Sequence, residues 1–218
     1  MNLREKWDRA SRSYDWMNFG EDVRQGEDKR RLYERARGRT ILVAVGTGND
    51  FKFLPPGLDV VGLDVSPRMI ERARPRAERY DGNVELRVAD VQSLDYPTSS
   101  FDTVVTACTF CSVPDPVRGL RELFRVLKPD GRLLMYEHVR SNVRDVGLFL
   151  DLLTYVTRRI GPDLNRETVA NARRAGFHIV REENVYFDVV KAIEAIKPVE
   201  QRVTVRPPMS MEPKGGST

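Results

Sequence analysis

Two glycines and an acid stand at the ends of consecutive apolar runs in the first third of the sequence. The run Ile41–Val45 ends directly in Gly46-Thr-Gly48, and the run Val60–Leu63 ends in Asp64. Glycines in such a turn let the backbone approach a ligand closely, and an acid at the end of the next strand can accept hydrogen bonds from both hydroxyls of a ribose. This pattern predicts a site for a nucleoside-containing cofactor.

Histidine is the residue type most suited to proton transfer, and the chain has two of them. His138 ends the apolar run Leu133–Tyr136 plus Glu137, and the carboxyl ends of parallel strands face the ligand crevice. His138 is therefore our candidate for a general base, with Glu137 beside it to orient it. The alternative is that His138 only ends the strand and shapes the pocket. We interpret His178, inside a later predicted strand, as structural.

The two cysteines, Cys108 and Cys111, have the spacing of a redox or zinc pair. A zinc site would need two more ligands, and His138 and His178 do not stand at a recognised zinc spacing from them. We interpret the cysteines as reduced thiols near a strand end, and we predict no metal site.

Five short apolar runs are predicted as strands that carry these residues. Several of them are apolar almost throughout, which is typical of a parallel sheet covered on both faces. Helical segments separate them: Ser66-Pro67 is a helix start, with Pro75 expected to kink or shorten that helix, and Pro116–Lys128 has one apolar stripe. The alternation predicts an α/β, Rossmann-like doubly wound sheet. The expected strands are Thr40–Val45, Asp59–Leu63, Val84–Ala89, Phe101–Ala107 and Arg132–Glu137.

The last third of the chain has a different pattern. Val146–Ile160 is a strongly apolar helical segment, and Asn165 can cap a short helix after it. The strands predicted at Phe177–Phe187 and Val189–Lys197 have almost nothing between them, so they must pair antiparallel. We therefore expect a seven-stranded sheet, mostly parallel, with a C-terminal antiparallel hairpin.

The domain organisation follows from these elements. We expect one domain over residues 1–197, with a helical cap at residues 1–39 and an apolar lid helix at residues 146–160. Residues 198–218 are polar and rich in Pro, Gly and Ser, so we expect a flexible tail.

Composition narrows the class of protein. The chain has 218 residues, 40% hydrophobic and 31% charged, with a net charge of +4. Acids are mixed with the basic residues, which argues against nucleic-acid binding, while the small basic excess allows an anionic membrane surface. There is no recognisable signal peptide and no apolar run of membrane-spanning length, so we expect a cytoplasmic protein.

Five segments in order resemble the class I S-adenosylmethionine-dependent methyltransferases, over roughly residues 7 to 197. Within that class the chain is most similar to the branch of quinone-biosynthesis, phospholipid N- and small alkyl-thiol methyltransferases. The segments are VGTGND, GLDVSPRMI, ELRVADVQSLDY, SFDTVVTACTFCSVPDP and RVLKPDGRLLMYEHV, and the branch is indicated by CSVPDP, YEHV, GPDLNRETVANARRAGF and the Ala10, Tyr14, Asp15 pattern.

The resemblance implies S-adenosyl-L-methionine as cofactor and assigns roles to matching residues. Asp64 is expected to accept the ribose hydroxyls, Asp90 the adenine amino group, and Tyr14 to close over the cofactor from the N-terminal helix. The full set implied for the cofactor is Tyr14, Val45, Gly46, Thr47, Gly48, Asn49, Asp64, Val65, Ser66, Met69, Asp90, Val91, Thr106 and Cys108, with Tyr14 and His138 near the reaction.

One position departs from the family pattern. The family usually has an acid two residues before the first glycine of the loop, where this chain has Ala44. Asp50, which stands where the common pattern has its third glycine, could supply the missing charge; otherwise cofactor affinity is lower.

The acceptor is indicated only by apolar residues. Val146–Ile160 could line a channel for an apolar acceptor, or could be a core helix or dimer surface. Trp7 and Trp16 among basic residues at the N-terminus are compatible with docking on an anionic membrane. A phospholipid head-group amine of the phosphatidylethanolamine type is our first expectation, with a quinone-precursor ring or a small thiol as alternatives. Two alternative functions belong to other classes of protein: a non-catalytic cofactor-binding module and a nicotinamide oxidoreductase. The sequence does not indicate the oligomeric state.

Overall fold

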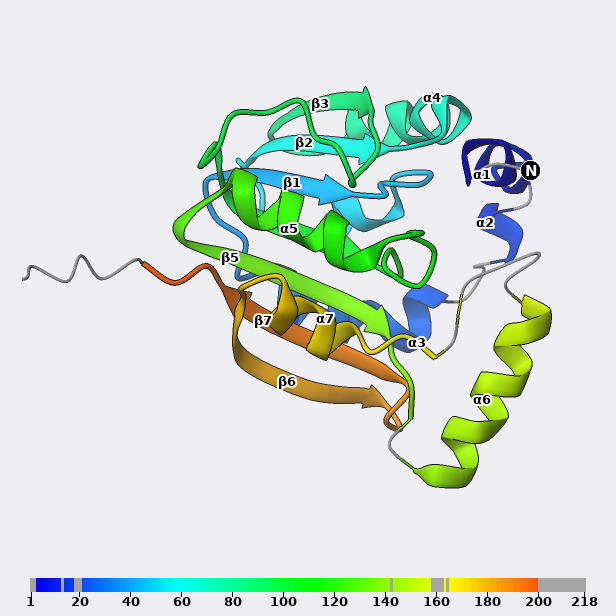
Figure 1. Cartoon of the computed structure of the whole chain (residues 1–218). Helices are drawn as coiled ribbons and strands as arrows, with labels where there is room; N and C mark the ends of the chain where they lie inside the picture. Colours follow the sequence, from blue (N-terminus) through cyan, green and yellow to red (C-terminus); the bar gives the residue numbers. More distant parts are fainter. Residues whose placement is uncertain are drawn as a thin grey trace, which may run out of the picture.

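A seven-stranded mixed sheet is the centre of the molecule in the computed structural model (Figure 1). The structure describes residues 3–12, 14–17, 21–141, 143–157, 163 and 165–199. The strand order is β3-β2-β1-β4-β5-β7-β6, and the first five of these strands are parallel. β7 pairs antiparallel with both β5 and β6, which confirms the predicted sheet and its C-terminal hairpin. The strands are β1 Arg39–Val43, β2 Asp59–Asp64, β3 Asn83–Val88, β4 Phe101–Ala107, β5 Leu127–His138, β6 His178–Tyr186 and β7 Val190–Ile196.

Helices cover both faces of the sheet. Leu120 and Leu123 of one helix and Ala172 of another pack in the core on one face. Tyr33, Phe51 and other apolar residues of three further elements fill the core on the opposite face. The first two helices are α5 Pro116–Val126 and α7 Thr168–Arg174; the opposite face carries α3 Glu21–Tyr33, the 3-10 helix η1 Asn49–Phe53 and α4 Pro67–Ala77.

The start of α4 follows the predicted capping chemistry. The Ser66 hydroxyl accepts a hydrogen bond from the Met69 N–H at 3.1 Å, and Pro67 occupies the first turn of α4. α4 continues through Pro75 and ends at Ala77, two residues after that proline.

One predicted turn lies inside a strand. The Lys128–Gly131 segment interrupts the pairing of β5 with β4, whose register jumps from Phe101 opposite Leu127 to Thr103 opposite Arg132. The turn thus forms a bulge, and β5 is longer than the predicted strand.

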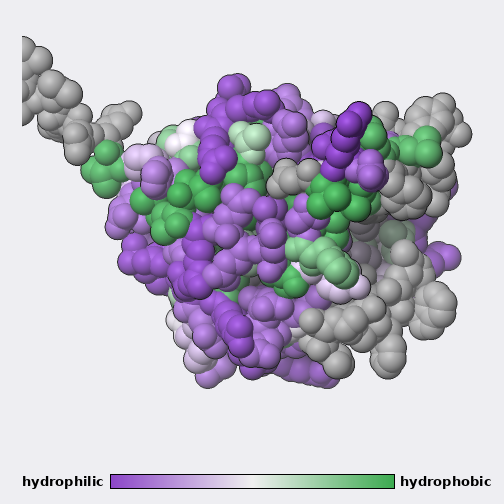
Figure 2. Space-filling view, turned by 90° about the horizontal axis from the view of Figure 1, so that it is seen from below, coloured by the Kyte–Doolittle hydropathy of each residue, from purple (hydrophilic) through white to green (hydrophobic). Residues whose placement is uncertain are grey.

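The apolar segment after β5 forms α6 Arg144–Thr157, which stands beyond the carboxyl ends of the strands (Figure 1). α1 Leu3–Ala10 and α2 Tyr14–Met17 lie at the same end of the sheet. Seen from the β6 side, hydrophobic residues also gather on the surface toward this end (Figure 2). No helix in the described ranges is long and apolar enough to span a bilayer. Residues 158–160 of the predicted lid and the predicted tail from residue 200 lie outside the described residues.

Candidate active site

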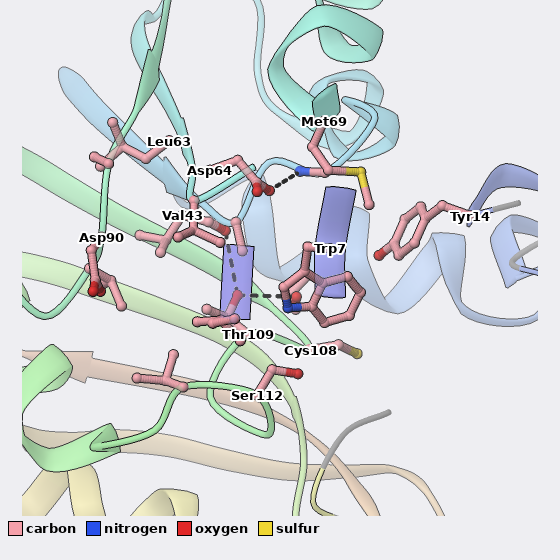
Figure 3. Close-up of a pocket in the computed structure, with 18 residues that line it drawn as sticks. Trp7, Tyr14, Val43, Leu63, Asp64, Met69, Asp90, Cys108, Thr109 and Ser112 are labelled. Carbon is pink, nitrogen blue, oxygen red and sulfur yellow. Dashed lines mark hydrogen bonds between the residues drawn. The ribbon is translucent and has the colours of Figure 1, made fainter. Parts of the chain in front are cut away.

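A cavity opens at the carboxyl ends of β1, β2, β4 and the segment after β3, beneath α1 and α2 (Figure 3). Its enclosed volume is about 70 Å³, and the wider hollow of about 680 Å³ includes open solvent. The wall is mostly apolar, with two carboxylates, a few hydroxyls and one thiol. It is formed by Leu3, Trp7, Tyr14, Val43, Ala44, Gly46, Leu63, Asp64, Val65, Met69, Ala89, Asp90, Val91, Ala107, Cys108, Thr109, Ser112 and Val113.

The glycine turn after β1 has the conformation that its sequence predicts. Gly46 and Gly48 have φ angles of 55° and 86°, in the left-handed region that favours glycine. A side chain on Gly48 would also meet the backbone of Ala73 at 3.2 Å, so the turn packs tightly against α4. The turn therefore presents backbone, rather than side chains, to the cavity at Gly46.

Asp64 ends β2 and is almost fully buried on the cavity wall. One carboxylate oxygen accepts the Gly46 N–H and the other accepts the Ser66 N–H, each at 2.9 Å. Burial raises the pKa of this carboxyl above its usual range, and the backbone hydrogen bonds oppose that shift. Asp64 thus holds the glycine turn and the start of α4 together while one side of it faces the cavity.

Two carboxylates on the N-terminal helices form hydrogen bonds with residues next to this cavity. Asp8 of α1 accepts the Ser66 hydroxyl at 2.5 Å. Asp15 of α2 accepts the Thr47 hydroxyl at 2.5 Å and an Arg76 N–H at 3.1 Å. The helices therefore dock on the glycine turn and on the start of α4.

The aromatic residues of the same helices face the cavity. Trp7 and Tyr14 project from α1 and α2 toward the strand ends (Figure 3), with their ring centroids 6.2 Å apart and the rings at 75°. Trp7, which the sequence suggested for a membrane surface, has its ring on the cavity wall, and its contact with a membrane stays a prediction.

Glu137 at the end of β5 anchors the opposite wall. Its side chain is fully buried and accepts the Thr106 hydroxyl at 2.8 Å and the N–H groups of Thr109 and Phe110 at 3.0 and 3.2 Å. Burial raises the pKa of Glu137 to about 7, although these hydrogen bonds lower it. Cys108, between these partners, has a φ of 48°, so the carboxylate holds a strained segment of the wall.

A family model described as a methyltransferase domain matches residues 41–135. The chain is 38% identical to a demethylmenaquinone methyltransferase of Thermus thermophilus, over 57% of this chain and 60% of that relative's length. It is 34% identical to a phosphatidylethanolamine N-methyltransferase of Cereibacter sphaeroides, over 60% and 68% of the two chains. A demethylmenaquinone methyltransferase of Clavibacter sepedonicus is 30% identical across 94% of both chains. This chain belongs to the class I S-adenosylmethionine-dependent methyltransferases.

The fold of solved methyltransferases agrees with this assignment. A putative methyltransferase solved in complex with the Haloferax volcanii Trm112 methyltransferase activator has a TM-score of 0.72 and 20% identity, over 92% of this chain and 99% of that chain. The family uses S-adenosyl-L-methionine as its methyl donor, and the cavity of this methyltransferase has two carboxylates, Asp64 and Asp90, among apolar residues.

The methyltransferase cavity brings together about half of the residues that the sequence predicted for the cofactor. Asp90 lies on the wall and accepts the Gln92 N–H at 2.9 Å. The predicted residues on the wall are Tyr14, Gly46, Asp64, Val65, Met69, Asp90, Val91 and Cys108. The predicted residues Val45, Thr47, Gly48, Asn49, Ser66, Thr106 and His138 are not among the residues that line it.

Thr47, Ser66 and Thr106 instead bond Asp15, Asp8 and Glu137, which hold the wall in place. Thr109, Ser112 and Val113 were missed, because they lie in the irregular segment after β4, where no periodic pattern marks a wall residue.

Two predictions about neighbouring charges need correction. Glu137 does not orient His138: its carboxylate faces the segment after β4, and successive residues of a strand project to opposite faces. Asp50 does not replace the acid missing at Ala44, because Asp50 pairs with Lys29 at 3.1 Å and does not line the cavity. Ala44 itself is on the wall, with a φ of 52°.

Proposed function

We propose that this methyltransferase transfers the methyl group of S-adenosyl-L-methionine to an apolar, lipid-like acceptor, with the head-group amine of an ethanolamine phospholipid as first candidate. The observation that carries the choice of an amine is the aromatic pair Trp7 and Tyr14 on the cavity wall. Aromatic faces attract sulfonium and ammonium groups, and the methylated amine product is such a cation. The Cereibacter relative, whose name describes this reaction, supports the same choice.

The cofactor's place follows from the carboxylates. In this proposal Asp64 accepts the ribose hydroxyls, Asp90 accepts the adenine amino group, and the Gly46 turn lies against the methionine portion. In Figure 3 Tyr14 and Cys108 lie at the end of the cavity away from Asp90, and in this proposal the reacting methyl lies near them. The cofactor supplies an activated methyl on a sulfonium, and the protein's task is alignment, which can contribute ~7–11 kcal/mol.

A protonated amine must lose its proton before it can attack. We propose His138, the last residue of β5, as the general base. His138→Gln should lower kcat, because proton transfer by a positioned base contributes roughly 10²–10⁴-fold. An unchanged kcat would remove His138 from the reaction.

A ring carbon of a demethylated quinone is the second candidate. The Thermus and Clavibacter relatives are both named demethylmenaquinone methyltransferases, and the second covers nearly the whole of this chain. A small alkyl thiol would also fit the apolar wall and needs less deprotonation than an amine.

The test compares the three acceptors directly. Labelled S-adenosyl-L-methionine is incubated with the protein and detergent-dispersed phosphatidylethanolamine, a reduced demethylmenaquinone, or an alkyl thiol, and the organic phase is separated by chromatography. Label in the phospholipid amine supports the first candidate, and label only in the quinone or thiol replaces it. Cofactor binding by calorimetry with no label in any acceptor would favour a non-catalytic binding module.

A further inference from the structure

Large apolar side chains stand exposed in one region of the surface. Six of the described apolar residues there have exposed fractions between 41% and 80%. Four precede or belong to α6, and two form the turn between β6 and β7. They are Val143, Val146, Leu148, Leu152, Tyr186 and Phe187.

α6 exposes two leucines on its outer face. Leu148 and Leu152, four residues apart and so on one helical stripe, are 54% and 72% exposed. On other sides of the helix Thr154 is only 2% exposed, and the half-exposed Asp151 pairs with Arg140 at 2.8 Å. Exposed apolar side chains that lie together on a surface mark a site of interaction with a membrane or another molecule.

The turn between β6 and β7 extends the same surface. The Ser141 hydroxyl, just before α6, donates to the Asp188 carboxylate at 2.7 Å, and the Val139 N–H donates to the Val189 carbonyl at 2.9 Å. Phe187, beside these contacts, is 80% exposed with a φ of 49°. Hydrophobic residues are visible on this side of the molecule in Figure 2.

The charges around this surface favour an anionic partner. α1 stands at the same end of the sheet as α6 (Figure 1), and Arg4, Arg9 and Arg12 are exposed on or just after it. Arg144 is exposed at the start of α6. The exposed acids on these two helices are fewer, namely Glu5 and Asp145.

We propose that Leu148, Leu152 and Phe187 insert into the head-group region of an anionic lipid bilayer, with the exposed arginines against the lipid phosphates. Apolar side chains on a helix and a protruding turn, flanked by cations, match an interface with a polar outer zone and an apolar interior. This proposal rests on the proposed lipid-like acceptor, because docking here would hold the protein at the membrane that contains such an acceptor. It places the anchor on α6 and the β6–β7 turn, since Trp7 of α1 is part of the cavity wall.

The test is co-sedimentation with vesicles of phosphatidylcholine containing phosphatidylglycerol. The variants are Leu148→Ser combined with Leu152→Ser, and Phe187→Ser alone. Val180→Ser is the matched control, because Val180 is 53% exposed on β6, away from the turn. We expect the double variant to weaken vesicle binding at least about tenfold, Phe187→Ser severalfold and the control not at all, with cofactor affinity unchanged in all three.

Two results would overturn the proposal. One is vesicle binding that the variants leave unchanged. The other is absence of vesicle binding together with a concentration-dependent dimer, measured by sedimentation, that the double variant dissociates, because a second copy would then cover the surface. The acceptor test uses detergent-dispersed acceptors, so methyl transfer without vesicle binding contradicts the docking surface alone, and vesicle binding without methyl transfer to any acceptor contradicts the proposed function alone.

Discussion

The two sides of the cavity are built by different means. On the side proposed for the cofactor, called the cofactor side below, the ends of β1 and β2 present a glycine turn and Asp64, and the buried Gly46 N–H donates a hydrogen bond to the Asp64 carboxylate. On the other side, the wall after β4 takes its shape from Glu137, a residue of a different strand that does not itself line the cavity. Beyond it stands α6, whose apolar face is exposed.

The difference shows that the sheet topology itself fixes the positions of the glycine turn and Asp64. Parallel strands end at one edge, so a turn and an acid placed at two strand ends must meet there. No such rule places the segment after β4 or the outward face of α6, and these are the parts that can change with the acceptor while the cofactor side is kept.

Asp64→Ala should have the largest effect of these variants, and the main change should be a loss of cofactor affinity. Loss of hydrogen bonds from two ribose hydroxyls to a charged acceptor is expected to cost ~3–6 kcal/mol, roughly 10²–10⁴-fold in cofactor affinity. The free energy of unfolding should also fall by about 1–3 kcal/mol, since the Gly46 and Ser66 N–H groups lose their acceptor. Calorimetry and urea denaturation measure the two effects. Full cofactor affinity in the variant would remove Asp64 from the site.

The cofactor side is also the part that the sequence predicted best. Asp64 and the glycine turn were found because an apolar run followed by a turn residue identifies a strand end. The place of Trp7 on the cavity wall did not follow from the sequence, because a short amphipathic helix does not show there whether its aromatic face meets a ligand, lipid or protein. The exposed leucines of α6 were not predicted for a related reason: Val146–Ile160 is apolar on most sides, so its sequence does not show which side faces the body.

Glu137→Gln should change how the free energy of unfolding depends on pH. The pKa of Glu137 is raised by burial to about 7, above the ordinary 4.5, so the native state binds this proton more tightly than the unfolded state. The stabilisation is complete below pH 4.5 and is lost as the pH rises to about 7, by about 3 kcal/mol in total. Urea denaturation from pH 4.5 to 8 should show this decline in the wild type and a weaker one in Glu137→Gln.

The same decline in both proteins would mean that another group causes it. Asp64 would be the next group to measure, because burial raises the pKa of this carboxyl above its usual range. Cofactor affinity at pH 6 should change little in Glu137→Gln, because the carboxylate holds the opposite wall.

Asp15→Ala tests whether the N-terminal helices belong to the cofactor side. The variant removes the acceptor for Thr47 and Arg76, and burial of Asp15 is outweighed by these hydrogen bonds, which lower its pKa. Because the Asp15 and Arg76 side chains are 40% and 37% exposed, screening limits the expected loss to about 1 kcal/mol, roughly fivefold in cofactor affinity. Asp15→Asn, which keeps one acceptor oxygen, should lose less. Equal affinity in all three proteins would mean that the helices dock without affecting the cofactor.

Ser112→Ala should have the smallest effect, and it should fall on the acceptor alone. Ser112 lines the cavity from the segment after β4, on the wall held by Glu137. Loss of one neutral hydrogen bond from this half-exposed hydroxyl to an acceptor is worth ~0.5 kcal/mol, about twofold in kcat/KM, with the cofactor dissociation constant unchanged. Ser100→Ala is the control. Ser100 lies just before β4, at the amino ends of the strands and far from the cavity, and its hydroxyl donates to the Pro97 carbonyl. If Ser112→Ala weakens the cofactor instead, the division of the cavity into two sides is wrong at this residue, and the acceptor must approach along the wall formed by Trp7 and Tyr14.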